Sequence, residues 1–64
     1  MTKYVIARDG VYVKDHPSGF HYCESIEDAM TFDTNISAIA YATMKLGLAV
    51  HEYRIELVHV PVGV

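Results

Sequence analysis

Residues 34–47 (TNISAIAYATMKLG) constrain this chain more than any other stretch, because they alone are long enough and correctly patterned for a full helix. From Thr34 to Val50 the only charged residue is Lys45. A helix on the surface of a small domain normally carries a charged outer face. The sequence therefore predicts a helix over about residues 35–46 that is apolar nearly all the way round, with Gly47 as its stop.

Two apolar stripes run along this predicted helix at three- and four-residue spacing. We assign one stripe to the sheet: Ile36, Ile39, Ala40, Thr43 and Leu46 or Gly47. The second stripe combines small side chains, which let another backbone approach closely, with an amphipathic tyrosine: Ala38, Tyr41, Ala42 and Lys45. We predict that two copies of the chain meet at this second stripe around a twofold axis, and that Val58 and Val60 of the valine-rich end contribute to the interface.

The first part of the chain predicts an antiparallel meander of three strands. Residues 3–8 (KYVIAR) and 11–14 (VYVK) flank Asp9-Gly10, a pair that is typical of the type I′ turn of a hairpin. Residues 16–19 (HPSG) predict a second turn, because proline fixes φ and glycine accepts a left-handed conformation. Residues 20–24 (FHYCE) then predict the third strand.

The longest predicted strand covers residues 50–60 (VHEYRIELVHV). Its apolar and charged side chains alternate as they do in a strand with one buried and one wet face: Tyr53, Ile55 and Leu57 against Glu52, Arg54 and Glu56. After Leu57 the apolar residues move to the even positions. Either a bulge reverses the two faces there, or the tail leaves the sheet.

The remaining segment predicts a short helical turn over residues 26–30, capped by Ser25, with Ala29 and Phe32 in the core. The element order β-β-β-α-β predicts one domain, residues 1–64, with a two-layer α+β fold: an antiparallel sheet packed on one helix, the last strand returning beside the first. The sheet face predicted to meet the helix holds Tyr4, Ile6, Val11, Val13, Phe20, Tyr22, Tyr53, Ile55 and Leu57. The face predicted to be wet holds Lys3, Val5, Tyr12, Lys14, His21, Cys23, Glu52, Arg54 and Glu56.

The apolar content of the chain is high for its size. A chain of 64 residues keeps roughly 40% of its unfolded surface exposed, yet 52% of these residues are hydrophobic and only 20% are charged. We therefore expect a homo-oligomer, with a dimer favoured, that buries apolar surface against another chain. The alternative is that five tyrosines and many alanines raise the apolar count while tolerating water.

Charge and cysteine content restrict the ligands and the compartment. A net charge of -3 with five Lys and Arg argues against nucleic acid, because phosphate contacts need a basic face. No apolar run reaches the roughly 20 residues of a membrane helix, and no signal peptide is evident, so we expect no membrane association. Cys23 is the only cysteine and cannot form an intramolecular disulfide, which fits the cytoplasm.

The residues that could carry chemistry do not form a known pattern. His21, Cys23, His51 and His59 are possible metal ligands, but their spacing matches no closed zinc site. His21 and Cys23, two residues apart on a strand, project in parallel, and no third group is evident to orient a base. No glycine-rich phosphate loop is present. We expect no metal, no cofactor and no catalysis.

A resemblance covers nearly the whole chain. It includes Tyr4-Val5-Ile6, Val11-Tyr12-Val13, Ser25 to Phe32 (SIEDAMTF), the alanine-rich helix and residues 53–58 (YRIELV). In this order of elements the chain resembles small uncharacterised proteins encoded by phages and prophages of Gram-positive bacteria. The resemblance implies an accessory factor, and it allows a host or defence protein as the partner that the chain binds and inhibits. It implies no individual functional residue.

Overall fold

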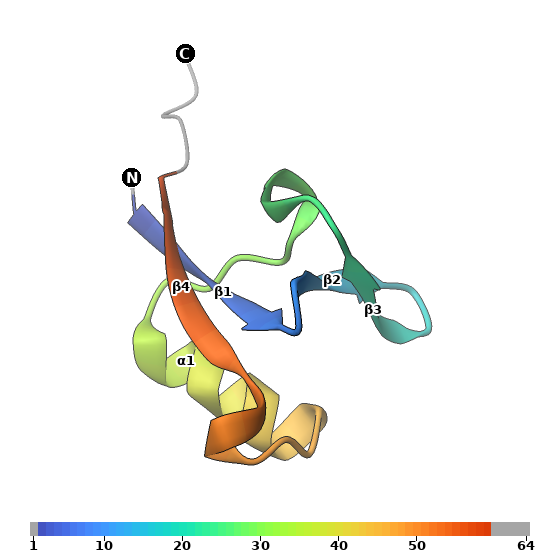
Figure 1. Ribbon diagram of the computed structural model, residues 1–64, viewed down its shortest axis with the longest axis vertical. Coiled ribbons are helices and arrows are strands. Elements are labelled where there is room, and N and C mark those ends of the chain that lie inside the picture. Colours follow the sequence, from blue (N-terminus) through green and yellow to red (C-terminus); the bar gives the residue numbers. More distant parts are fainter. Residues whose placement is uncertain (1, 60–64) are drawn as a thin grey trace.

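The computed structural model describes residues 2–59, and it has four antiparallel strands and one helix (Figure 1). The strands are β1 (Thr2–Arg8), β2 (Val11–His16), β3 (Gly19–Cys23) and β4 (Arg54–His59), in the sheet order β3-β2-β1-β4. The helix α1 (Asn35–Ala40) continues into the π-helical turn η2 (Tyr41–Lys45), and two short 3-10 turns are η1 (Ile26–Asp28) and η3 (Val50–Glu52). The predicted α+β class is confirmed.

The turn between β1 and β2 has the predicted type I′ character. Asp9 has a φ of 49° and Gly10 a φ of 83°, and both values are positive as this turn requires. Beyond the turn the two strands pair only at Ala7 with Tyr12 and at Arg8 with Val11, after which they diverge. The sheet therefore consists of two ribbons, β1 with β4 and β2 with β3, joined by a short hinge of paired residues (Figure 1).

The segment before the helix fills the space between the diverging strands. The Met30 amide donates to the Val13 carbonyl at 2.9 Å, and Phe32 exchanges two backbone hydrogen bonds with Tyr4 at 2.8 and 2.9 Å. The backbone amide and carbonyl groups of β1 and β2 that the diverging strands leave unpaired thereby gain hydrogen-bond partners. Ala29 is buried and Phe32 packs against the core, so the prediction for these two side chains is confirmed.

Local signals set the two ends of the helix. The Thr34 hydroxyl accepts a hydrogen bond from the Ser37 amide at 3.0 Å, which is an N-cap. Gly47 has a φ of 68° at the opposite end and stops the helix as predicted. Ser25 makes no side-chain cap of η1, so that prediction is wrong. The Ser25 carbonyl instead accepts bonds from the Asp28 amide and the Cys23 thiol.

The main core lies between the helix and the sheet, and it contains the two alanines of the stripe that was predicted to meet a second copy. Its fully or nearly buried members are Ile6, Val13, Ala38, Ala42, Leu48 and Tyr53. Ala38 and Ala42 thus face the sheet, whereas Ile36 is 79% exposed, so the assignment is wrong for these residues. The physical reason is size complementarity: the strands supply the bulky side chains, and alanines let the helix approach them closely. Leu46 packs against the core as predicted.

β1 is buried on both of its faces. Ile6 points into the main core, and its neighbours Val5 and Ala7, which point to the opposite face, are also buried. The prediction that Val5 lies on a wet face is therefore wrong. Within residues 2–59, three buried residues do not belong to the main core cluster: Val5, Ala7 and Ala29. Ala29 directly follows the η1 turn, which contacts β2.

The last strand is shorter than predicted. Residues 50–52 form η3, in which the Glu52 carboxylate accepts a hydrogen bond from the Ala49 amide at 2.8 Å, and β4 begins only at Arg54. From Thr2 opposite His59 to Ala7 opposite Arg54 the register with β1 is constant, so no bulge occurs within β4. Leu57 is 65% exposed and does not join the core. Residues 60–64, including Val60, lie outside the described residues.

Candidate functional site

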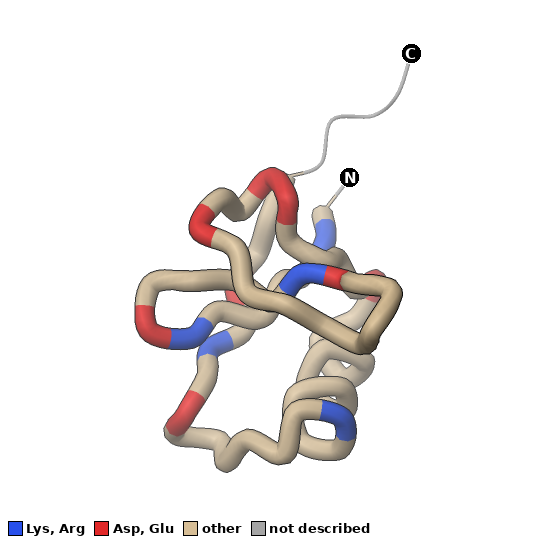
Figure 2. The backbone as a smooth tube through the Cα atoms, turned by 90° about the vertical axis from the view of Figure 1, so that its right-hand side faces the viewer, with Lys and Arg blue, Asp and Glu red and all other residues tan. Residues whose placement is uncertain are grey.

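The outward side of the helix carries apolar side chains where charged ones are usual. Ile36, Ile39, Thr43 and Met44 share this side, which we name the outer helix face. Ile36 and Met44 are the most exposed, at 79% and 85%. Figure 2 shows the helix almost free of charged residues, whereas both signs of charge are spread over the strands and turns. The outer helix face is the candidate functional site.

The hydroxyl groups near this face are already engaged within the helix. Thr43 donates its hydroxyl hydrogen to the carbonyl of Ile39 at 2.9 Å, a bond to the preceding turn that leaves its methyl group as the free part. Thr34 donates its hydroxyl hydrogen to the hydroxyl of Ser37 at 2.8 Å. The hydrogens of these hydroxyl groups are therefore not available to water, and the face is more apolar than its composition indicates.

An aromatic cluster flanks the outer helix face. The Tyr41 ring packs against Phe32 with centroids 5.3 Å apart, and the Lys45 ammonium lies 5.9 Å from the Tyr41 centroid. Burial, and to a smaller extent the negative charge of Asp15, raise the pKa of the Tyr41 phenol. Tyr41 therefore stays neutral, and Lys45 is the only charged residue between Thr34 and Val50.

The structure separates the six residues predicted to form an interface. Ala38 and Ala42 are fully buried in the core of their own chain, so they cannot contact a partner. Tyr41 is half-buried, Lys45 is exposed and Val58 is half-buried in β4. Val60 lies outside the described residues. Tyr41 and Lys45 remain neighbours, but the structure does not bring Val58 into their aromatic cluster.

The outer helix face consists mainly of residues that the sequence pattern placed against the sheet. Both stripes have the same spacing, so spacing could not distinguish them. The usable signal was the excess of apolar residues over what one stripe can bury. That excess indicated an apolar outer face without identifying its members.

A small polar cleft lies at the C-terminal end of β1. Its volume is about 280 Å³, and it is lined by Ala7, Arg8, Asp9, Gly10, His51, Glu52, Tyr53 and Arg54. The Arg8 guanidinium donates to the Tyr22 hydroxyl at 3.3 Å and lies 3.8 Å from the Glu52 carboxylate. The hydrogen bond to Tyr22 is the main cause of a raised Arg8 pKa. Two cations and two anions balance in this cleft, so it offers no net attraction for a charged ligand.

His16, His21 and Cys23 contact other groups of the protein. His21 stacks on His16 with centroids 3.7 Å apart and the rings nearly parallel. The Cys23 thiol donates to the Ser25 carbonyl at 3.3 Å and is not bonded to His21. Within residues 2–59, no three His, Cys, Asp or Glu side chains gather in a way that could hold a metal ion.

Comparison of the chain with protein-family models, with curated proteins and with solved structures gave no match. The resemblance to phage and prophage proteins therefore stays a prediction. Over the described part of the chain, no helix combines the length and the apolar character that crossing a bilayer requires.

Proposed function

We propose that this protein is a protein-binding module that associates with itself and has no catalytic activity. The observation that supports protein binding is the outer helix face, on which Ile36, Ile39 and Met44 are exposed and no charged side chain intervenes. Apolar side chains gathered on one exposed helix face are typical of protein contact surfaces. Cys23 is a free thiol, which fits a role in the reducing cytoplasm.

The binding energy available from the outer helix face is limited. Complete burial of one large aliphatic side chain contributes about 1.5–3 kcal/mol. Ile36 and Met44, each exposed for most of its surface, would together contribute about 2–5 kcal/mol when a partner covers them. Bringing two proteins together costs about 4–15 kcal/mol in lost freedom. A stable complex therefore needs contacts on a further element of the fold.

Site-specific photo-cross-linking tests the proposal. The photoreactive residue p-benzoylphenylalanine is placed at Ile39, at the centre of the outer helix face, and the protein is irradiated in the cells that produce it. We expect a covalent adduct with another protein chain. The same probe at Ser18, which is exposed on the β2–β3 turn, is the matched control and should give little adduct.

A second set of variants links the adduct to the apolar surface. Replacing both Ile36 and Met44 by glutamate should leave the fold intact, because both side chains are exposed, and should remove the adduct from position 39. An adduct with a host protein would make the chain an accessory factor that binds its host, as the resemblance implies. Equal labelling from Ser18 and Ile39, or labelling that survives the double substitution, would contradict the proposal.

A further inference from the structure

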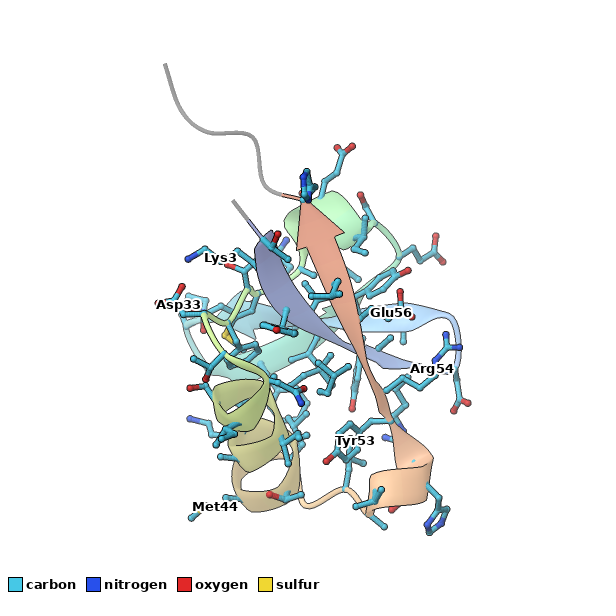
Figure 3. All side chains as sticks on the ribbon, turned by 90° about the vertical axis from the view of Figure 1, so that its left-hand side faces the viewer. Lys3, Asp33, Met44, Tyr53, Arg54 and Glu56 are labelled. Atoms are coloured by element: carbon cyan, nitrogen blue, oxygen red, sulfur yellow. The ribbon has the colours of Figure 1, made fainter. Side chains whose placement is uncertain are left out.

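β4 is an outer strand of the sheet, and only one of its edges is paired. That edge meets β1 along the whole strand, whereas the other edge meets no strand within residues 2–59. Figure 3 shows β4 crossing in front of β1. A free strand edge presents unpaired N–H and C=O groups that can pair with another chain. β4 contains neither proline nor lysine, the residues that commonly block such edges.

The two faces of β4 differ in chemistry. Arg54 and Glu56 project to one side of the strand (Figure 3), and their side chains form an ion pair at 3.0 Å. Ile55 and Leu57 project to the other side, toward the layer that holds the helix. Ile55 packs against the main core, but Leu57 is left largely exposed.

We propose that a second copy of this chain pairs with the free edge, β4 against antiparallel β4, around a twofold axis at Ile55. In this register Arg54 of each copy lies opposite Glu56 of the other, so the interface contains two cross-strand ion pairs. On the opposite face Leu57 lies beside Tyr53 of the second copy, and the two Ile55 side chains meet at the axis. Tyr53 directly precedes β4 and has extended backbone angles, φ -148° and ψ 166°, so it can pair as a strand residue does.

The charges of β4 favour this register over its neighbours. Two residues that lie opposite each other in an antiparallel pair point to the same face. A twofold axis between two strands of the same sequence must therefore pass beside one residue, which then lies opposite its own copy. An axis at Glu56 places the two Glu56 carboxylates opposite each other. An axis at Leu57 places Glu56 opposite Val58 and leaves the charges unpaired. Of these three axes, only the one at Ile55 places Arg54 of each copy opposite Glu56 of the other.

This interface deepens the proposed function, because it names the second copy as the partner in self-association and assigns it an edge of the sheet. It leaves the outer helix face free for another protein. The two proposals fail separately. Cross-linking from Ile39 tests the helix face, and the variants described next test the β4 edge.

Charge reversal tests the register. Arg54→Glu places two carboxylates opposite each other at both cross-strand contacts of the homodimer, and Glu56→Arg places two guanidinium groups opposite each other there. Each variant alone should therefore dimerise about ten- to a hundredfold more weakly than the wild type. An equimolar mixture of the two variants should form a heterodimer, because the acidic strand of one variant then faces the basic strand of the other.

Both cross-strand contacts differ in composition between the homodimers and the heterodimer of the two variants. In a heterodimer of the two variants, one cross-strand contact joins the glutamate introduced at position 54 to the arginine introduced at position 56, and the other joins the native Arg54 to the native Glu56. Both contacts therefore bring opposite charges together. We expect a heterodimer from two chains that do not self-associate, although neither chain can form its own Arg54–Glu56 ion pair.

Sedimentation equilibrium from about 10 μM to about 1 mM measures these affinities, since small interfaces bind weakly. Lys14→Glu and Glu24→Arg make the same charge changes at exposed positions on and beside the β2–β3 ribbon and should leave the dimer unchanged. Circular dichroism tests whether each variant is folded. A monomeric wild type, single variants that dimerise normally, or a folded mixture that stays monomeric would each overturn the proposed interface.

Discussion

Replacing Val5 by alanine removes two methyl groups from a side chain that is fully buried on the face of β1 opposite the helix. Each buried methylene-sized group contributes about 0.8 kcal/mol, so the lost transfer free energy is about 1.6 kcal/mol. The cavity left behind adds to this cost, because the surrounding side chains relax only partly. We expect Val5→Ala to lower the free energy of unfolding by about 2–3 kcal/mol.

That loss is large for a chain of this length. Domains have about 0.05–0.15 kcal/mol of stability per residue, which gives about 3–10 kcal/mol here. Urea denaturation followed by circular dichroism is the measurement. With a slope near the lower end for small proteins, about 1 kcal/mol per molar urea, the midpoint should fall by about 2–3 M while the slope stays the same.

Val50→Ala is the matched control, because it makes the same chemical change at a valine that is 78% exposed in η3. It should change the stability by less than about 0.5 kcal/mol. If Val5→Ala costs no more than Val50→Ala, the second face of β1 is not packed, and the account of a strand buried on both faces is refuted.

Three further predictions concern single positions. Gly10→Ala should cost about 1 kcal/mol, although a Cβ there meets no atom within 4 Å, because the φ of 83° is unfavourable for alanine; an unchanged urea midpoint would contradict this. Thr34→Ala should cost about 1 kcal/mol by removing the N-cap, whereas Ser25→Ala, whose hydroxyl caps nothing, should cost much less; equal losses in thermal unfolding would contradict the cap. The raised pKa of Tyr41 means that the folded state holds this proton more tightly, so the associated stability is complete below about pH 10 and is lost as the pH rises through the folded pKa. Tyr41→Phe should remove that part of the alkaline decline in urea midpoints, and an identical decline in both proteins would show that Tyr41 does not contribute.

Local structure was predictable from the sequence because it depends on preferences of a few adjacent residues. Asp9-Gly10 adopts positive φ at both positions, Thr34 caps the helix, and Gly47 ends it. These residues act through their own backbone angles and hydrogen bonds. The chain around them therefore indicated the first hairpin and the helix without reference to the rest of the molecule.

The start of β4 could not be predicted from the local sequence pattern. Residues 50–52 alternate like a strand, yet they form η3, in which Glu52 bonds to the Ala49 amide. Alternation specifies a strand only where another strand is available to pair with it. β1 pairs with β4 from Thr2 to Ala7, and its partner residues end at Arg54. β4 therefore begins where its pairing with β1 begins, next to the end of β1 at Arg8.

The sequence by itself determined that this chain has a nearly uncharged helix and more apolar side chains than one small core can bury. Only the tertiary structure decided that Ala38 and Ala42 face the sheet and that Ile36 and Met44 face outward. The two stripes have the same helical spacing, and the choice between them depends on the size of the side chains that the strands present. Bulky residues of the sheet, such as Ile6 and Val13, fit against small residues of the helix, and this complementarity exists only once the elements are packed together.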